Sequence, residues 1–273
     1  MTIILYKLPS IIKGKIISRP SKLCKSPYVA DVILENNEQQ IIAHSPSLGC
    51  SGYANSGEYV YLIKNENPKL CTHVIHLACR NEKNTNYLVG IHPKSAEIIV
   101  QYSLLNNHIN KLKNISNLQR EKTFLNSRFD FICKDENNRQ TIIEVKNVPC
   151  ADYEDIEQKQ RKKMDFSNRD INSKIAYFPD GYRKKKNDIV SPRALKHIKE
   201  LQRLKEENPE YRCILIFVIQ RKDVCSFQAS IVDPIYKQAL NEAYVNGVEI
   251  IPIQVYWNDQ GECIYHKELN YNP

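Results

Sequence analysis

The stretch that most constrains this chain is a pair of short apolar runs that carry acidic side chains and are joined by a polar link. The runs are 128–134 (Arg-Phe-Asp-Phe-Ile-Cys-Lys) and 141–147 (Thr-Ile-Ile-Glu-Val-Lys-Asn), and the link is rich in Asp, Asn and Glu. Two such runs around a polar link predict a β-hairpin with a longer loop. The fold must therefore accommodate charged side chains on two neighbouring strands.

Side-chain alternation along a strand predicts which of these charges lie together. Glu144 and Lys146 share one face of their strand, and Val145 takes the other. Asp130 can approach Glu144 from the partner strand if the register permits, because paired strands lie about 4.8 Å apart. Two carboxylates suit Mg²⁺ or Mn²⁺, with the carbonyl oxygen of Val145 as a further ligand. Lys146 would steady developing negative charge or orient an attacking water.

This is the Asp…Glu-x-Lys pattern of the PD-(D/E)xK nucleases, with thirteen residues between Asp130 and Glu144. The pattern alone has low specificity, because an acid followed by Glu-x-Lys occurs by chance in many chains. A hairpin whose charges lie on a solvated face is the alternative interpretation.

Further motifs occur in the order typical of one protein family. They are Ser127-Arg-Phe-Asp-Phe131, Glu144-Val-Lys-Asn-Val148, Phe178-Pro-Asp180, Arg193-Ala-Leu-Lys-His-Ile-Lys-Glu-Leu201, Phe217-Val-Ile-Gln-Arg221, and Asp233-Pro234 before Gly247-Val-Glu249. With Val29-Ala-Asp31 and His44-Ser-Pro46, they resemble the sugar fermentation stimulation protein A (SfsA) family over most of the chain.

The resemblance implies an α/β (α+β) fold with two domains. Residues 1–84 would form an OB-like β-barrel that binds nucleic acid. Residues 85–273 would form a PD-(D/E)xK restriction-endonuclease-like domain with a mixed central sheet. A charged stretch near 150–175 looks like an insertion, because the family passes from Glu-Val-Lys-Asn to Phe-Pro-Asp over a shorter link. His92 stands where the family usually has Asn.

Other candidate site residues surround the hairpin. Glu121 stands where the resembling family has an acidic residue and is a candidate third carboxylate, although a solvent-facing glutamate is the alternative. Gln220, at the end of an apolar run, is a candidate to orient the lysine or the water. His197 is either a supporting group or an ordinary core histidine. The candidate nucleic-acid contacts are Arg128, Arg183, Lys184, Arg193, Lys196, His197 and Arg221.

Local patterns outside the hairpin predict the remaining organisation. Short strands are expected at 2–8, 11–17, 28–35, 39–43, 58–64 and 71–79, and polar residues 81–86 are expected to join the two domains. Basic residues between 13 and 25, with Tyr28 nearby, fit a groove that follows a nucleic-acid backbone or a solvated barrel edge. Ser191-Pro192 is expected to begin a helix.

Composition limits the partners and the compartment. The chain has 39 Lys and Arg against 31 Asp and Glu, a net charge of +8 that favours a polyanion such as DNA or RNA. No stretch approaches about eighteen apolar residues and no secretory leader is evident, so we expect no membrane association. Nine scattered cysteines predict a reducing intracellular compartment, cytoplasmic or nuclear.

The sequence therefore predicts a Mg²⁺- or Mn²⁺-dependent nuclease, a hydrolase of phosphodiester bonds in DNA or RNA. Asp130 and Glu144 would hold the metal, and water would be the nucleophile. A non-catalytic nucleic-acid-binding regulatory protein is the alternative. The sequence does not decide whether the substrate is DNA or RNA, or whether cleavage is internal or terminal. It also leaves open whether the protein forms a homodimer.

Overall fold

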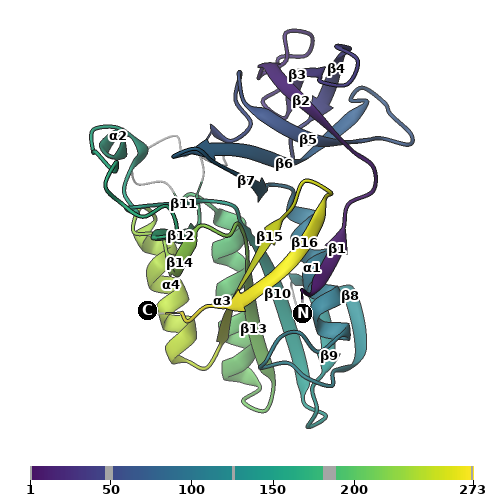
Figure 1. Ribbon diagram of the computed structural model, residues 1–273. Coiled ribbons are helices and arrows are strands. Elements are labelled where there is room, and N and C mark those ends of the chain that lie inside the picture. Colours follow the sequence, from purple (N-terminus) through teal and green to yellow (C-terminus); the bar gives the residue numbers. More distant parts are fainter. Residues whose placement is uncertain (1, 47–51, 125–126, 181–188, 272) are drawn as a thin grey trace.

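The computed structural model describes residues 2–46, 52–124, 127–180, 189–271 and 273, which form a mixed α/β fold dominated by strands (Figure 1). None of the described helices has the length and hydropathy to cross a bilayer. The helices are α1 (Pro93–Leu105), α2 (Gln158–Arg161), α3 (Pro192–Glu207) and α4 (Pro234–Val245). The strands are β1 (Ile4–Lys7), β2 (Ile11–Ser18), β3 (Val29–Leu34), β4 (Gln40–His44), β5 (Tyr59–Lys64), β6 (His73–Glu82), β7 (Thr85–Gly90), β8 (Ser116–Phe124), β9 (Ser127–Lys134), β10 (Gln140–Val148), β11 (Ala151–Asp152), β12 (Lys174–Phe178), β13 (Arg212–Gln220), β14 (Val224–Ala229), β15 (Glu249–Trp257) and β16 (Glu262–Glu268).

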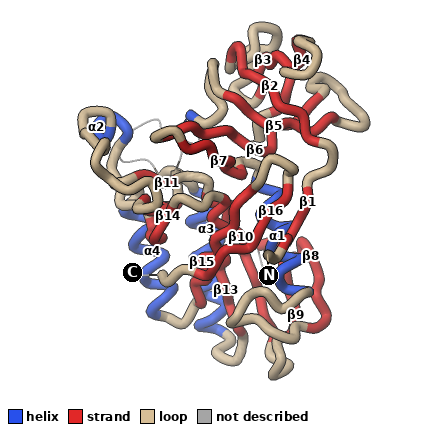
Figure 2. Tube along the Cα trace, in the orientation of Figure 1, coloured by secondary structure: helices blue, strands red, loops and turns tan. Residues whose placement is uncertain are grey.

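Strands β2 to β6 form a ring at one end of the molecule (Figure 2). They follow the order β4-β3-β2-β5-β6, and β4 also pairs in parallel with β6. Inward-facing β-branched and leucine side chains such as Val32, Leu62 and Ile75 fill the interior. Gly14 permits close packing there, since a Cβ would lie 2.7 Å from Cγ1 of Val32. The short strands expected in this part of the chain are confirmed.

The stretch 81–86, expected to join the two domains, forms the turn and flanks of the β6–β7 hairpin. Asn81 pairs with Asn86 and Glu82 with Thr85. Lys83 and Asn84 take positive φ values of 50° and 61°, which match the twist of a two-residue hairpin turn. The turn contains no glycine, so the sequence carried no strong signal for it. The domain boundary expected at 84/85 falls within this turn.

The rest of the chain builds a mixed sheet in the order β7-β15-β13-β10-β9-β8, with helices on both faces. Strand β13 runs parallel to both β10 and β15 and is buried along its length. Alternate residues of β13 enter different cores: Leu215 and Phe217 pack with α3 and α4, whereas Ile214 and Ile216 pack with α1. The continuous apolar run predicted such a strand, and the structure confirms it.

The charged stretch near 150–175 leaves the sheet as β11 and the short helix α2, and returns as β12. Strands β11, β12 and β14 form a small separate sheet. This stretch has no apolar stripe, and polar contacts attach it to the rest of the protein instead. The buried carboxylate of Asp155 accepts hydrogen bonds from Nε2 of Gln228 (2.8 Å), Oγ of Ser230 (2.9 Å) and the backbone N–H of Ile231 (2.8 Å).

Candidate metal centre

The β9–β10 hairpin brings Asp130 and Glu144 to the same place. The antiparallel register pairs Phe131 with Ile143, so Asp130 and Glu144 are the next residues on each strand. Oδ2 of Asp130 accepts a hydrogen bond of 2.7 Å from the backbone N–H of Val145. The Asp130 side chain therefore reaches across to the neighbouring strand beside Glu144.

The carboxylate of Glu144 is 3% exposed, and its two oxygens differ. Oε1 accepts hydrogen bonds from the ammonium of Lys146 and from Nδ1 of His197, which α3 brings to the strand. Oε2 is buried and has no hydrogen-bond partner among the described residues. A buried carboxylate oxygen without a partner is costly, so this atom is where a cation would stabilise the site.

The two carboxylates have opposite pKa shifts. Burial and the neighbouring charge of Glu144 raise the pKa of Asp130 to about 6. Burial also acts to raise the pKa of Glu144, but the charge of Lys146 and the hydrogen bond from His197 outweigh it and lower that pKa. Such a separation is typical of functional carboxylate pairs.

The donor set fits a hard divalent cation with few protein ligands. Mg²⁺ is commonly held by one or two carboxylates and keeps several waters. No group of three or more His, Cys, Asp or Glu side chains is arranged to hold a metal within the described ranges. Asp130 and Glu144 would therefore be the side-chain ligands.

Glu121 lies opposite Asp130 in the β8–β9 pairing, because the register pairs Arg120 with Phe131 and Lys122 with Phe129. Its carboxylate forms ion pairs with Lys94 (2.9 Å) and with Arg128, and its role as a third metal ligand stays a prediction. Glu97 on α1 is a further carboxylate near Asp130, since its charge adds, after burial and the charge of Glu144, to the raised pKa of that carboxyl group. A position on a helix 33 residues before Asp130 gave no signal that sequence reasoning could have used.

Comparisons with known proteins identify the family of this chain. A sequence model described as "Sugar fermentation stimulation protein RE domain" matches residues 94–261, more than half of the chain. The chain belongs to the SfsA family. A sugar fermentation stimulation protein homolog of Shewanella frigidimarina is 27% identical over 260 residues, covering 94% of this chain and 95% of its own length. A homolog from another Shewanella strain is 29% identical and covers 89% of each chain.

The fold of this SfsA-family protein also matches a solved structure. The structure of Pyrococcus furiosus SfsA in complex with Ca²⁺ superposes with a TM-score of 0.76 and 18% identity, covering 99% of this chain and 100% of that one. The likeness shows that the two proteins share a fold over their whole lengths.

Gln220 lies at the end of β13, where it contacts neighbours of the carboxylates. Its Nε2 donates to Oδ1 of Asn147 (2.6 Å), and its Oε1 accepts from Nε1 of Trp257 (2.9 Å). Gly90 is required beside it, because a Cβ there would lie 1.9 Å from Oε1 of Gln220. Gln220 thus contacts the residue after Lys146, and Asn147 is a member of the site that sequence reasoning missed.

The side chain of Arg221 is directed into the protein interior, where a nucleic acid could not reach it. Its guanidinium is 1% exposed and donates to both oxygens of Asp223 (2.7 and 2.6 Å), to the hydroxyl of Tyr53 (2.5 Å) and to the carbonyl of Pro149 (3.1 Å). The expectation that Arg221 contacts a phosphate is therefore corrected. Its position at a strand end was not enough to distinguish a buried arginine from an exposed one.

The other residues expected to contact nucleic acid differ in their exposure and partners. Arg193 and Lys196 are exposed on α3, one turn or less from buried His197. Arg128 is exposed but paired with Glu121. Arg183 and Lys184 lie outside the described residues.

Proposed function

We propose that this SfsA-family protein is a metal-dependent nuclease that hydrolyses phosphodiester bonds in DNA or RNA. The observation that carries the proposal is the buried carboxylate of Glu144, which has one oxygen bonded to Lys146 and His197 and the other without a partner among the described groups. Asp130 lies beside it with a raised pKa. Asp130 and Glu144 would hold Mg²⁺ or Mn²⁺.

Each neighbouring side chain has a distinct proposed task. When bound, the cation would polarise a phosphoryl oxygen as a Lewis acid. Lys146 would steady the negative charge that develops on the phosphoryl group, because its ammonium already lies at the carboxylate pair. His197 is a positioning residue: its bond to Oε1 of Glu144 fixes the carboxylate so that Oε2 faces the metal position.

The proposed nucleic-acid path uses two surfaces. The exposed side of α3 presents Arg193 and Lys196 close to His197, where cations would hold the phosphate backbone. The ring of β2 to β6 would act as an OB-like module that holds a single strand. In this proposal both surfaces contact the nucleic-acid substrate.

The related Pyrococcus furiosus protein was solved in complex with Ca²⁺, a cation that takes oxygen ligands. We infer that the present chain also binds a divalent cation through oxygen atoms. Ca²⁺ titration by calorimetry would provide a readout that does not depend on cleavage. Binding should be lost in Asp130→Asn and kept in Glu121→Gln.

The test of catalysis is cleavage of labelled single- and double-stranded DNA and RNA with Mg²⁺, with Mn²⁺ and with a chelator. We expect metal-dependent cleavage that falls about a hundredfold or more in Asp130→Ala and Lys146→Ala. Lys199→Ala, an exposed lysine on α3, is the matched control and should retain activity. Loss of activity in Glu121→Gln would indicate that Glu121 is also a metal ligand, and would contradict a site formed by Asp130 and Glu144 alone.

A nucleic-acid-binding regulator is the second candidate, and one observation favours it. Lys146 and His197 already surround Oε1 of Glu144, so part of the buried charge is compensated without a cation. In that case no substrate would be cleaved, and Lys146→Ala would leave salt-sensitive binding intact. The same cleavage and binding assays therefore separate the two functions.

A further inference from the structure

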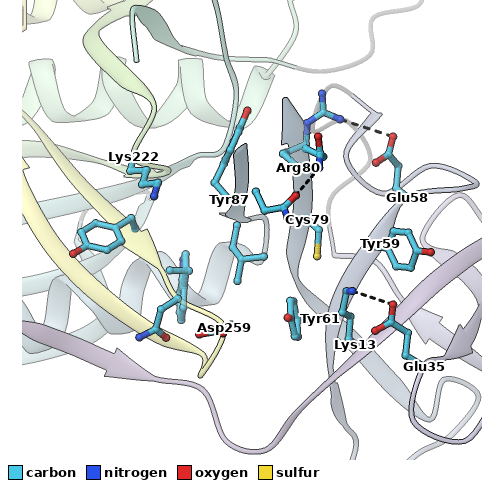
Figure 3. A pocket seen from close by; sticks show the side chains of 16 residues that line it. Lys13, Glu35, Glu58, Tyr59, Tyr61, Cys79, Arg80, Tyr87, Lys222 and Asp259 are labelled. Atoms are coloured by element: carbon cyan, nitrogen blue, oxygen red, sulfur yellow. Dashed lines mark hydrogen bonds and ion pairs between the residues drawn. The ribbon is translucent and has the colours of Figure 1, made fainter. Parts of the chain in front are cut away.

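A cavity of about 810 Å³ lies between the strand ring and the β15–β16 hairpin, apart from the carboxylate pair (Figure 3). This volume falls within the range of about 300–1,000 Å³ that is usual for ligand pockets. Strands β5, β6 and β7 form one wall, and the end of β15 with its following turn, together with Lys222, forms the other. The cavity is therefore built by both halves of the chain.

Aromatic rings dominate the apolar part of this pocket. Tyr59, Tyr61, Tyr256 and Trp257 all line it. Tyr59 is 37% exposed, so part of its side chain faces solvent, whereas Trp257 is 5% exposed. Rings gathered in this way suit a flat aromatic ligand, since stacking on a side-chain ring stabilises every nucleobase.

The charges in the pocket are nearly balanced. Lys13 pairs with Glu35 at 3.0 Å, and Arg80 lies 3.8 Å from Glu58. Lys222 and Asp259 add one charge of each sign. A polyphosphate would find little net attraction here, whereas a base with one phosphate or a sugar would not be repelled.

The polar groups of the β6–β7 hairpin match the edge of a base. Nδ2 of Asn81 donates to Oδ1 of Asn86 at 2.7 Å, and both side chains are exposed in the pocket wall. This bond uses one N–H of Asn81, so the pair keeps an amide oxygen and an amide nitrogen for a ligand. Carboxamides of this kind recognise the donor and acceptor atoms of a base edge.

The pocket is joined to the candidate metal centre by hydrogen bonds. Trp257 donates to Gln220, and Gln220 donates to Asn147, the residue after Lys146. An occupant stacked near Trp257 would therefore contact a side chain bonded to the site. This connection would allow the pocket to hold one part of a substrate while another part lies at the carboxylates.

We propose that this pocket binds an unpaired nucleobase together with its sugar. The base would come either from a single strand or from a free nucleotide. If it belongs to a strand, the pocket deepens the proposed nuclease function and rests on it; a free nucleotide would bind independently of that function.

The chain's single tryptophan, Trp257, makes the proposal measurable by fluorescence. The full chain is titrated with adenosine 5′-monophosphate, with ribose 5-phosphate, and with single-stranded and duplex oligonucleotides. We expect quenching by a single strand or the mononucleotide, and none by ribose 5-phosphate. Tyr61→Leu should weaken binding about tenfold through loss of base stacking. Tyr102→Leu, a tyrosine on α1 outside the pocket, should bind like the unaltered chain.

The results distinguish a base in a strand from a free nucleotide, and they test the pocket independently of the nuclease proposal. Quenching by the oligonucleotide alone assigns the base to a strand, and quenching by the mononucleotide assigns it to a free nucleotide. Asp130→Ala should bind equally well, so failure of the nuclease proposal would leave this result unchanged. Equal quenching by ribose 5-phosphate, no quenching by any base, or equal weakening in Tyr61→Leu and Tyr102→Leu would overturn the pocket proposal.

Discussion

At the scale of single residues, His76 and His92 form a parallel stack with ring centroids 4.2 Å apart and an angle of 2° between the rings. Nδ1 of each ring is buried without a hydrogen-bond partner in the part of the chain described. Burial, followed by the charge of the other ring, lowers the pKa of His76 to about 3. Burial, followed by the charges of His44 and Lys94, lowers the pKa of His92 to about 4.

This pair should make the protein less stable in mild acid. Below about pH 6.5 the unfolded chain protonates both histidines, whereas the folded chain keeps them neutral down to about pH 4. The unfolded state then binds more protons, so the free energy of unfolding falls as the pH falls, by up to about 1.4 kcal/mol per pH unit for each ring.

His92→Asn should reduce this pH dependence by about half or more, because it removes one titrating ring and the charge that acts on the other. Urea unfolding at several pH values between 4.5 and 7 measures the slope. Parallel slopes for the two proteins would show that the stacked rings do not control acid sensitivity.

Residue patterns in the sequence located the charged strand positions but not every neighbour. Alternation along β10 was enough to place Glu144 and Lys146 together, because a strand has a fixed period of two. The pairing of Glu121 with Arg128 depends on how the β8–β9 hairpin folds, and the burial of Arg221 depends on its contacts with Tyr53 and Pro149, which lie far away in the chain. No local pattern encodes those contacts.

At the scale of elements, periodicity predicted most of what is observed. The helix expected to begin at Ser191-Pro192 is observed as α3, and its apolar residues at helical spacing are buried: Ala194, Leu195, Ile198, Leu201 and Leu204. The β6–β7 turn and the anchoring of residues 153–173 were missed for different reasons. The turn uses positive φ without glycine, and the stretch is held by polar groups that resemble solvated charges in the sequence.

Asp155 should be the group that fixes this stretch to the protein. Asp155→Ala leaves the amide of Gln228, the hydroxyl of Ser230 and the N–H of Ile231 without their acceptor. We expect a loss of about 1–3 kcal/mol in the free energy of unfolding, and faster trypsin cleavage at Lys162 and Lys163. Denaturant unfolding and limited proteolysis measure the two effects.

Asp165→Ala is the matched control for this element, because Asp165 is exposed and its carboxylate accepts hydrogen bonds from the backbone N–H and the hydroxyl of Ser167, two residues away. It should change neither stability nor cleavage by a comparable amount. Equal proteolysis of the two variants would mean that the stretch is held by its other contacts, such as the ion pair of Arg161 with Asp152.

At the scale of the whole molecule, a buried ion network joins the strand ring to the rest of the chain. Lys174 on β12 donates to Glu82 of β6 (2.6 Å), to Asp223 (2.8 Å) and to the hydroxyl of Tyr87 on β7 (3.1 Å). Its side chain is 4% exposed, and that of Asp223 is 2% exposed. Strand pairing also joins the two halves, through six residue pairs between β6 and β7 and one between β7 and β15, at Leu88 and Trp257. The network adds an ionic connection to β12, outside this ladder.

Lys174→Met should weaken this connection, because it leaves Glu82 and Asp223 partly buried without their shared cation. We expect a loss of about 3–5 kcal/mol in the free energy of unfolding, against about 1 kcal/mol or less for Lys7→Met, which removes a surface pair with Glu262. Hydrogen bonds from Lys174 and Tyr153 outweigh burial and lower the pKa of Glu82, and Arg221 together with Lys174 lowers that of Asp223. This stabilisation is therefore present above their unfolded pKa of about 4 and is lost as the pH falls further.

The same variant tests whether the two halves unfold together. Trp257 fluorescence reports on the β15 end of the molecule, and far-ultraviolet circular dichroism reports on all strands and helices. The two signals should coincide during urea unfolding of the unaltered protein and separate in Lys174→Met, because the ring then loses its main ionic contact with β12. Coincident transitions in the variant, with a stability loss no larger than that of Lys7→Met, would show that the hydrophobic contacts alone unite the molecule.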